Sequence, residues 1–169
     1  MIFKEYLNKK FYFNLSTVLI IFFLDRITKK IIIHLNQENF GQYIFSSEYL
    51  NISLVWNKGI AFGLLSFNEN YVYNILTTLI VLVTFVILLM ILKNDGFKRF
   101  SLLMIMGGAL GNLYDRIFFS AVPDFIDFHV GNFHWFIFNV ADIFITIGVI
   151  FMILIEFIDN NKSQLNEKN

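Results

Sequence analysis

The sequence predicts an α-helical integral membrane protein of four transmembrane helices with a small β element outside the membrane. Hydrophobic residues make up 57% of the 169-residue chain and charged residues 15%, whereas a soluble domain carries about 25% charged residues. The apolar residues also gather in four long stretches. These observations argue against a soluble enzyme, a disordered chain and a nucleic-acid binder. The length predicts a single membrane-embedded domain over residues 1–169.

Each apolar stretch is close to the ~20 residues that a helix needs to cross ~30 Å of hydrocarbon. The second stretch contains no charged residue, whereas the other three carry a few acidic or basic side chains near one end. We expect the spans at about residues 11–33, 71–92, 100–119 and 138–158.

The basic residues are unevenly distributed between the segments that connect these spans. Eight lie in the N-terminal tail, the short segment 93–99 and the C-terminal tail, whereas the long loops at about 34–70 and 120–137 contain Lys58 alone. Lys and Arg concentrate on the cytoplasmic side of membrane proteins. Both termini are therefore predicted to be cytoplasmic and both long loops to lie outside, where Trp56 and Trp135 fit an interfacial aromatic belt.

The two outer loops contain patterns that are typical of strands. Residues 50–56 roughly alternate apolar and polar side chains, and Asn57-Lys58-Gly59 follows as a turn. Residues 125–136 contain Gly131-Asn132 between two apolar runs, which predicts a hairpin. We therefore expect the β element to come from both loops.

Polar side chains inside the spans lie at one depth, near the outer interface. Such residues are expensive in a membrane, so each is a functional candidate. They are Asp25 and Lys29 in the first span, Asn112, Asp115 and Arg116 in the third, and Asn139 and Asp142 in the fourth. Helical spacing places Gly108, Asn112 and Asp115 on one stripe, and Asn139 and Asp142 on another.

Some of these residues also have a purely structural interpretation. Asp25 and Lys29 have the i, i+4 spacing of a helix ion pair, with the acid first. Asp115 and Arg116 fit a structural pair that holds the outer loops. Gly107 and Gly111 have the spacing that lets a neighbouring helix approach closely.

Asp124 and Asp142 are distinct because neither has a basic residue three or four positions away, and the loop between them contains no Lys or Arg. Two close carboxylates cannot both stay ionised, so such a pair can share a proton and activate water against a carbonyl. Spacing alone leaves open a catalytic pair or solvated loop carboxylates. Asp127 competes with Asp124 for the catalytic role.

Two histidines, His129 and His134, flank the predicted hairpin turn, and Asp127 is nearby. A zinc site needs three or four convergent ligands. We therefore interpret the histidines as hydrogen-bonded surface groups and expect neither a metal nor a cofactor. The absence of cysteine excludes disulfides and thiolate sites.

Taken together, the motifs resemble those of the lipoprotein signal peptidases, or signal peptidases II, of bacterial inner membranes. The resemblance spans essentially the whole chain and follows the family's order. The matching segments are DRITK at 25–29, NKGIAFG at 57–63, GGALGNLYDR at 107–116, VPDFIDF at 122–128 and FNVAD at 138–142.

The resemblance implies an aspartic endopeptidase with four transmembrane helices, a small extracytoplasmic β element and no metal. It implies removal of the signal peptide from prolipoproteins by a cut before a cysteine that carries diacylglycerol. The catalytic pair would be Asp124 and Asp142. The supporting or substrate-binding residues would be Asp25, Lys29, Asn57, Gly108, Asn112, Asp115, Arg116, Asn139 and Ala141.

The expected partners are prolipoproteins and membrane lipids, with no nucleic acid, and we expect a monomer whose site lies near the outer face of the membrane. Three positions depart from the family's pattern. Pro123 replaces a non-Pro residue, Phe136 replaces the Pro of Trp-Pro, and Ile143 replaces a small polar residue. These departures flank the site and concern substrate preference more than activity.

Two other classes of function compete with an enzyme. A small proton-coupled transporter would line an ion path with Asp25, Asp115 and Asp142, but such a path needs polar groups at the midplane and inner half as well. Spans two to four are apolar there. A non-catalytic membrane scaffold would not need unpaired carboxylates on different segments.

Overall fold

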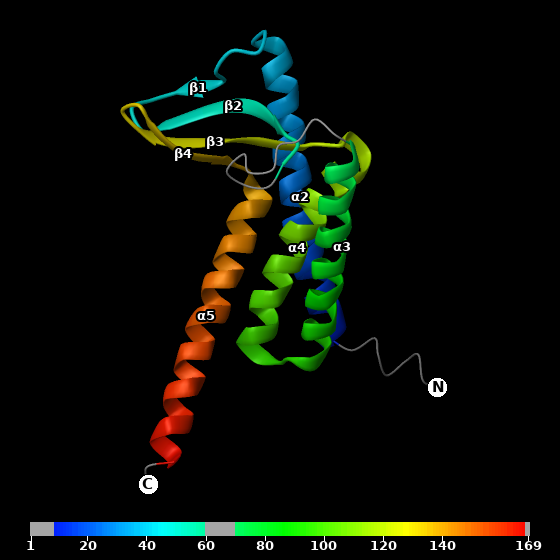
Figure 1. Cartoon of the computed structure of the whole chain (residues 1–169), viewed down its shortest axis with the longest axis vertical. Coiled ribbons are helices and arrows are strands. Elements are labelled where there is room, and N and C mark those ends of the chain that lie inside the picture. Colours follow the sequence, from blue (N-terminus) through cyan, green and yellow to red (C-terminus); the bar gives the residue numbers. More distant parts are fainter. Residues whose placement is uncertain (1–8, 60–69, 168–169) are drawn as a thin grey trace.

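A computed structural model of the chain describes residues 9–59 and 70–167. Long helices run side by side, and a small sheet lies across one end of them (Figure 1). The helices are α2 (Lys9–Glu38), α3 (Asn70–Lys93), α4 (Gly96–Phe119) and α5 (Val140–Glu167). The strands are β1 (Phe45–Ser46), β2 (Leu50–Asn57), β3 (Val122–Val130) and β4 (Phe133–Phe138).

All four predicted spans are helical, but several helix ends differ from the prediction. α2 extends to Glu38, and Phe40 and Gly41 then adopt the left-handed conformation that ends many helices, with φ of 52° and 79°. α5 begins at Val140 and continues to Glu167, about nine residues beyond the predicted end. The polar residues of this last segment are compatible with a helix. The apolar run therefore indicates which part of α5 suits a membrane, but it does not indicate where the helix ends.

α4 packs against each of the other three helices, and small residues allow two of these contacts. A Cβ atom on Gly107 would lie 2.8 Å from the Cβ of Ile21 in α2, and one on Gly108 would lie 2.5 Å from the carbonyl oxygen of Ala141 in α5. Neither position can carry a side chain without moving its neighbour. The predicted close approach of helices at the glycines is confirmed.

The helix faces that point away from the bundle are strongly apolar. Leu82 and Phe85 in α3 and Ile153 in α5 are each more than half exposed. Of the described helices, two qualify as membrane spans by length and hydropathy, Tyr73–Lys93 and Val140–Asn160, and little of either is buried within the protein. A soluble protein would bury such faces in its core, so these surfaces fit contact with lipid.

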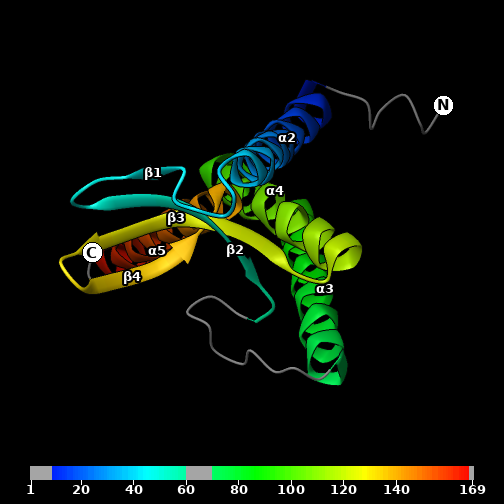
Figure 2. The ribbon, with the colours of Figure 1, turned by 90° about the horizontal axis from the view of Figure 1, so that it is seen from above.

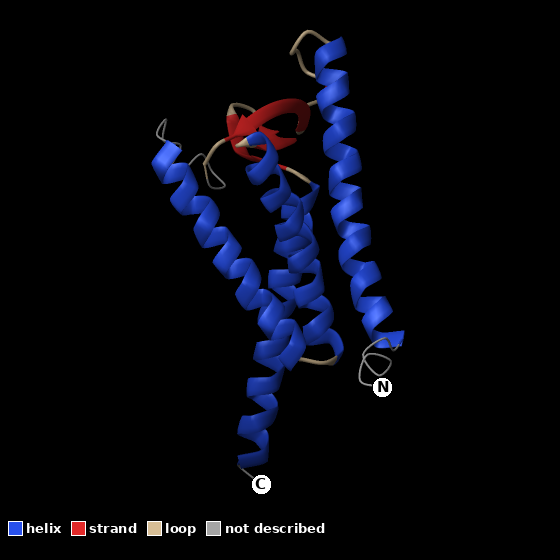
Figure 3. Cartoon of the chain, turned by 90° about the vertical axis from the view of Figure 1, so that its right-hand side faces the viewer, coloured by secondary structure: helices blue, strands red, loops and turns tan. Residues whose placement is uncertain are grey.

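The sheet joins segments from both predicted outer loops. Its strands follow the order β1-β2-β3-β4, and all neighbours are antiparallel. The predicted strand at 50–56 and the predicted hairpin are both present, and Gly131 in the hairpin turn has a φ of 58°. Seen from above, β3 and β4 lie over α5 (Figure 2). α2 passes the sheet and extends beyond it (Figure 3).

The pairing of β2 with β3 determines which loop residues meet above the helices. Asn57, the last residue of β2, lies opposite Val122, and Val55 lies opposite Asp124. Asp124 is therefore inside a strand, because β3 begins three residues before the predicted hairpin. Of the NKGIAFG segment, Asn57, Lys58 and Gly59 are described, whereas residues 60–63 lie outside the described residues.

Candidate active site

Nearly all of the predicted site residues come together where α2, α4 and α5 meet the sheet. Asp25, Asp115 and Asn139 have no exposed surface, and Lys29 is 1% exposed. Burial of so many polar groups at the end of an apolar bundle requires that each has partners. These partners divide the site into an ionic part, in which acids contact bases, and a neutral part, in which carboxylates contact uncharged amides.

The ionic part is the ion-pair cluster of Asp25, Arg26, Lys29 and Asp115. Lys29 Nζ lies 3.0 Å from Asp25 Oδ2 and 2.7 Å from Asp115 Oδ2. Arg26 Nη2 donates to the same two oxygens, at 2.8 and 2.7 Å. Two acids and two bases thus balance one another and join α2 to α4. The predicted Asp25–Lys29 ion pair is confirmed.

Arg116 is not part of this cluster, although it follows Asp115 directly. Consecutive residues of a helix point in directions about 100° apart, and Arg116 instead donates from Nη2 to the carbonyl oxygen of Gly59 at 2.6 Å. The Tyr73 hydroxyl donates to the Arg116 carbonyl oxygen at 2.9 Å. Arg116 therefore ties the segment after β2 to α4, whereas the expected Asp115–Arg116 pair is absent among the described residues.

The neutral part contains the aspartate pair, Asp124 and Asp142. Asp124 accepts hydrogen bonds from the side-chain amides of Asn57, at 2.8 Å on Oδ2, and Asn139, at 2.6 Å on Oδ1. Asp142 accepts one from the side-chain amide of Asn112, at 2.8 Å on Oδ1. We call Asn57, Asn112 and Asn139 the amide frame. Among the described residues, neither member of the aspartate pair takes part in an ion pair.

The start of α5 holds Asp142 in place. The Asn139 side-chain oxygen accepts the backbone N–H of Asp142 at 3.1 Å, and Asp142 Oδ2 accepts the backbone N–H of Asn139 at 3.2 Å. This reciprocal arrangement is a capping box, which satisfies two backbone donors at a helix start. The carboxylate is thus oriented by the helix terminus as well as by Asn112.

The ion-pair cluster and the aspartate pair are joined through polar contacts. Lys29 Nζ donates to Asn112 Oδ1 at 2.8 Å, and the same oxygen accepts from Asn139 Nδ2 at 3.2 Å. Asp25 Oδ1 accepts the backbone N–H of Ala141 at 3.1 Å. A Cβ atom on Gly111 would lie 2.6 Å from Asp25 Oδ2, so a larger residue there would displace the cluster.

The environment of Asp124 raises the pKa of its carboxyl. Burial and, after it, the negative charge of Asp142 raise the pKa of Asp124 from its ordinary value to about 6. The hydrogen bonds from Asn57 and Asn139 act in the opposite direction, because they stabilise the ionised carboxylate. Asp124 is therefore able to exchange a proton near neutral pH, as a general acid or base must.

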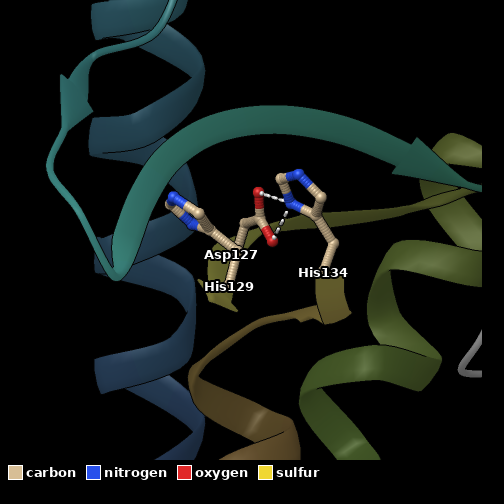
Figure 4. Close-up of side chains that lie close together, drawn as sticks. All are labelled: Asp127, His129 and His134. Atoms are coloured by element: carbon tan, nitrogen blue, oxygen red, sulfur yellow. Dashed lines mark hydrogen bonds and ion pairs between the residues drawn. The ribbon is translucent and has the colours of Figure 1, made fainter. Parts of the chain in front are cut away.

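Asp127 points away from this site, although it is 4% exposed and lies in the same strand as Asp124. Alternate residues of a strand face opposite sides of the sheet, and positions 124 and 127 differ by an odd number. The Asp127 carboxylate lies 2.9 Å from Nδ1 of His134 (Figure 4). Asp124 and Asp142 therefore share contacts with Asn139, whereas Asp127 contacts His134 and Asn51 on the other side of the sheet.

An apolar groove of about 190 Å³ runs beside Asp142, between the end of β4 and the first turns of α5. Two of the three departures from the family pattern, Phe136 and Ile143, line it. The complete lining is Phe136, Phe138, Asp142, Ile143, Thr146 and Ile147. An apolar segment in this groove would lie against one of the two carboxylates.

Sequence reasoning did not single out Arg26, Asn51 or Tyr73 as site residues. The sequence could have indicated Arg26, because it is a basic residue at the same depth as Asp25 and Lys29. It could not have indicated Tyr73 or Asn51, since their contacts depend on how α3 meets α4 and how β2 meets β3. Asn51 lies 3.5 Å from Asp127 through its amide nitrogen.

Comparisons with known proteins agree with this architecture. The family model described as Signal peptidase (SPase) II matches residues 17–158. The chain is 52% identical to the lipoprotein signal peptidase of Pelagibacter ubique strain HTCC1062, over 95% of this chain and 96% of that one. It is 45% identical to the lipoprotein signal peptidase of Anaplasma phagocytophilum strain HZ, over 70% and 75% of the two chains.

Solved structures of similar fold are bacterial membrane enzymes studied by the in meso method. The structure at 2.3 Å resolution superposes with a TM-score of 0.68 and 27% identity, over 88% of this chain and 90% of the other. The structure at 1.9 Å resolution gives a TM-score of 0.63 and 30% identity, over 83% and 90%. The mostly helical fold with a small antiparallel sheet is thus shared with membrane enzymes.

Proposed function

Because the chain belongs to the signal peptidase II family, we propose that it removes signal peptides from prolipoproteins by hydrolysis at the aspartate pair. The cut would precede a cysteine that carries diacylglycerol. The observation that carries the proposal is the position of Asp124 and Asp142, which are held by neutral amides at the outer end of an apolar bundle. Amide partners orient a carboxylate but leave its charge free to change.

In the proposed reaction the aspartate pair carries one proton. The ionised carboxylate takes a proton from a water molecule, and the water oxygen bonds to the carbonyl carbon of the scissile peptide. The protonated carboxyl donates to the carbonyl oxygen as negative charge develops there. When the C–N bond then breaks, a proton passes to the leaving amine of the modified cysteine. The raised pKa of Asp124 supports its role as the carrier of the shared proton.

The amide frame gives this chemistry its geometry. Asn139 contacts both sides, since its Nδ2 donates to Asp124 and its Oδ1 accepts the backbone N–H of Asp142. The frame thereby limits movement of the two carboxylates relative to one another. The apolar groove beside Asp142 suits a hydrophobic signal helix or the lipid of the modified cysteine.

We further propose four membrane spans, with both termini cytoplasmic and the whole chain acting as one monomeric peptidase domain. Ion pairs support this topology, because Lys10 near the start of α2 pairs with Asp95 between α3 and α4, and Lys98 in α4 pairs with Glu156 in α5. The three basic segments thus share one end of the bundle.

Thiol labelling tests this topology, because the chain has no native cysteine. A membrane-impermeant thiol reagent added from outside should label Val130→Cys but not Asp95→Cys. Labelling of both would contradict the topology.

The buried charges argue against the transporter interpretation. Among the described residues, the buried ionised groups lie at the sheet end of the helices. In the other half, buried Thr84 and Ser101 donate to carbonyl oxygens of their own helices. A proton path would need polar groups through that half.

Cleavage of a lipidated prolipoprotein by the purified chain tests the proposal. The parent should release the signal peptide, and Asp142→Asn should not, although it should insert and purify equally well. The same precursor without diacylglycerol serves as the matched control and should be cut far more slowly. Equal cleavage of both precursors would contradict the proposed substrate, and activity in Asp142→Asn would contradict the proposed chemistry.

A further inference from the structure

A second group of polar side chains, the Asp–His–His cluster, lies on the sheet away from the aspartate pair. It consists of Asp127, His129 and His134, which converge from two neighbouring strands (Figure 4). One ligand atom from each residue lies within 4.8 Å of the others. We propose that this cluster binds a divalent transition-metal ion of the zinc class.

The backbone of the β3–β4 hairpin brings the three side chains to one face. Asp127 and His129 are two residues apart in β3, so both point to the same side of the sheet. His134 in β4 lies directly opposite His129. The register shifts by one residue between Asp127 and His129, and such an irregularity re-aims neighbouring side chains. Three potential ligands are therefore fixed by a paired ribbon and not by a free loop.

The carboxylate of Asp127 is buried and faces imidazole nitrogen. Its two oxygens lie 3.0 and 2.9 Å from His134 Nδ1. A carboxylate–histidine hydrogen bond alone would explain this contact, but it would not explain the second imidazole. The rings of His129 and His134 are stacked, with centroids 5.0 Å apart and planes 19° apart, which puts two potential nitrogen ligands beside one acid.

Asn51 provides an outer contact for the carboxylate of the cluster, since metal-binding carboxylates are commonly hydrogen-bonded as well. Its side-chain oxygen accepts the Ser46 hydroxyl at 2.7 Å, which turns its NH₂ group toward the cluster. That nitrogen lies 3.5 Å from Asp127 Oδ2 and 3.4 Å from His129 Nδ1. The amide thus restrains one carboxylate oxygen from the β2 side, and a bound ion would take its place at His129 Nδ1, because both use the lone pair of that nitrogen.

Two imidazoles and one carboxylate suit zinc, which accepts such ligands at about 2.0–2.2 Å and takes water or another group in a fourth position. Tetrahedral ligands at these distances are roughly 3.4 Å apart, so the 2.9 Å contact between Asp127 and His134 must lengthen and the wider separations, which reach 4.8 Å at most, must shorten. The His134 side chain is 49% exposed, so solvent-filled space is available for its ring to turn. A bound ion would link β4 to β3, the strand that contains Asp124, without contacting the aspartate pair.

Zinc titration of the purified full-length chain, prepared without a polyhistidine tag and stripped by chelator, tests the site. Competition with a chromogenic indicator should give one zinc ion per chain. His129→Ala and His134→Ala should each bind zinc at least tenfold more weakly. His34→Ala, which removes the exposed histidine of α2, should bind as the parent does. The absence of cysteine means that no thiol contributes.

Cobalt substitution and heat stability give readouts that do not depend on peptidase activity. Co²⁺ in the parent should show the visible absorption of a four-coordinate ion, and zinc should raise Tm in the parent but not in a His129→Ala/His134→Ala double variant. Asp142→Asn should bind zinc like the parent, so failure of the hydrolysis proposal would not affect the result. Less than one zinc per chain, or unchanged binding by the double variant or by Asp127→Asn, would overturn the proposal.

Discussion

The protein holds two pairs of aspartates within one site, and the partners of the two pairs differ in kind. Asp25 and Asp115 contact Lys29 and Arg26, so each negative charge has a positive charge against it. Asp124 and Asp142 are held by asparagine amides and a backbone N–H. The same type of side chain therefore has two different environments within one site.

In the proposed mechanism, this difference separates the aspartates that support the site from the two that react. Ion pairs hold a carboxylate in its ionised form, because loss of the charge would leave a buried cation unpaired. Neutral amides fix position but permit either protonation state. A group that must gain and lose a proton in each turnover belongs in the second environment. The comparison thus predicts that changes in the ion-pair cluster affect stability first, and changes around the aspartate pair affect activity first.

The largest effect is expected from the aspartate pair itself. Asp124→Asn and Asp142→Asn keep the side-chain shape but remove the carboxylate, so each should reduce cleavage by roughly 10⁴-fold or more. The double variant should be no slower than either single variant, because the two groups act as one unit. Initial rates on a lipidated prolipoprotein measure the loss, and normal yield of inserted protein shows that folding is intact.

Asp127→Asn supplies the matched control, because Asp127 is equally buried in the same strand but faces the other side of the sheet. It should remain at least 100-fold faster than Asp124→Asn. The assignment of the pair would be wrong if Asp127→Asn were dead and Asp124→Asn nearly normal.

The next effect concerns the stability provided by the ion-pair cluster. Lys29→Met leaves Asp25 and Asp115 to share Arg26, and breaking a buried ion pair destabilises a protein by roughly 3–5 kcal/mol. Thermal unfolding in detergent should show a strongly lowered Tm. Lys10→Met removes one partner of the exposed Lys10–Asp95 ion pair and should change Tm little. Similar Tm values for the two variants would show that the cluster is not a structural support.

A smaller effect is expected from Asn112, which contacts both parts of the site. Its amide nitrogen orients Asp142, and its oxygen accepts from Lys29. Asn112→Ala should slow cleavage between about 10- and 100-fold, because the variant keeps the Asp142 carboxylate but loses the amide that positions it. Turnover and Tm should both be measured. Complete inactivity of a stably folded variant would mean that Asn112 does more than orient.

The sequence predicted the features that depend on local patterns. The apolar runs predicted the helices, the alternation at 50–56 predicted β2, and Gly131-Asn132 predicted the hairpin turn. The shared depth of Asp25, Asp115 and Asp142 predicted that polar groups from three helices would meet. These signals are available because hydropathy and turn chemistry act within a few residues.

The partners within the site could not be predicted in the same way. The contacts of Arg26 with Asp115 depend on the register of α2 against α4, which close packing at Gly107 and Gly111 sets in three dimensions. The choice between Asp124 and Asp127 depends on strand parity, and the hairpin was expected to begin only after Asp124. The convergence of Asp127 with both histidines depends on the register shift between β3 and β4.

The smallest effect is a shift in pH dependence from Asn57→Ala. The Asn57 amide stabilises ionised Asp124, so its loss should raise the pKa of Asp124 above its value of about 6. The pair would then keep its working proton to higher pH, and the basic limb of the kcat/KM profile should move upward. A hydrogen bond to a charged group contributes about 1.5–3 kcal/mol, so the shift should be on the order of one pH unit.

Asn51→Ala is the matched control, because Asn51 is an asparagine of the same strand whose amide contacts Asp127 and not Asp124. The basic limb of the kcat/KM profile of this variant should stay in place. A downward shift in Asn57→Ala would show that the amide stabilises the protonated carboxyl, and that Asp124 does not carry the shared proton in the proposed way.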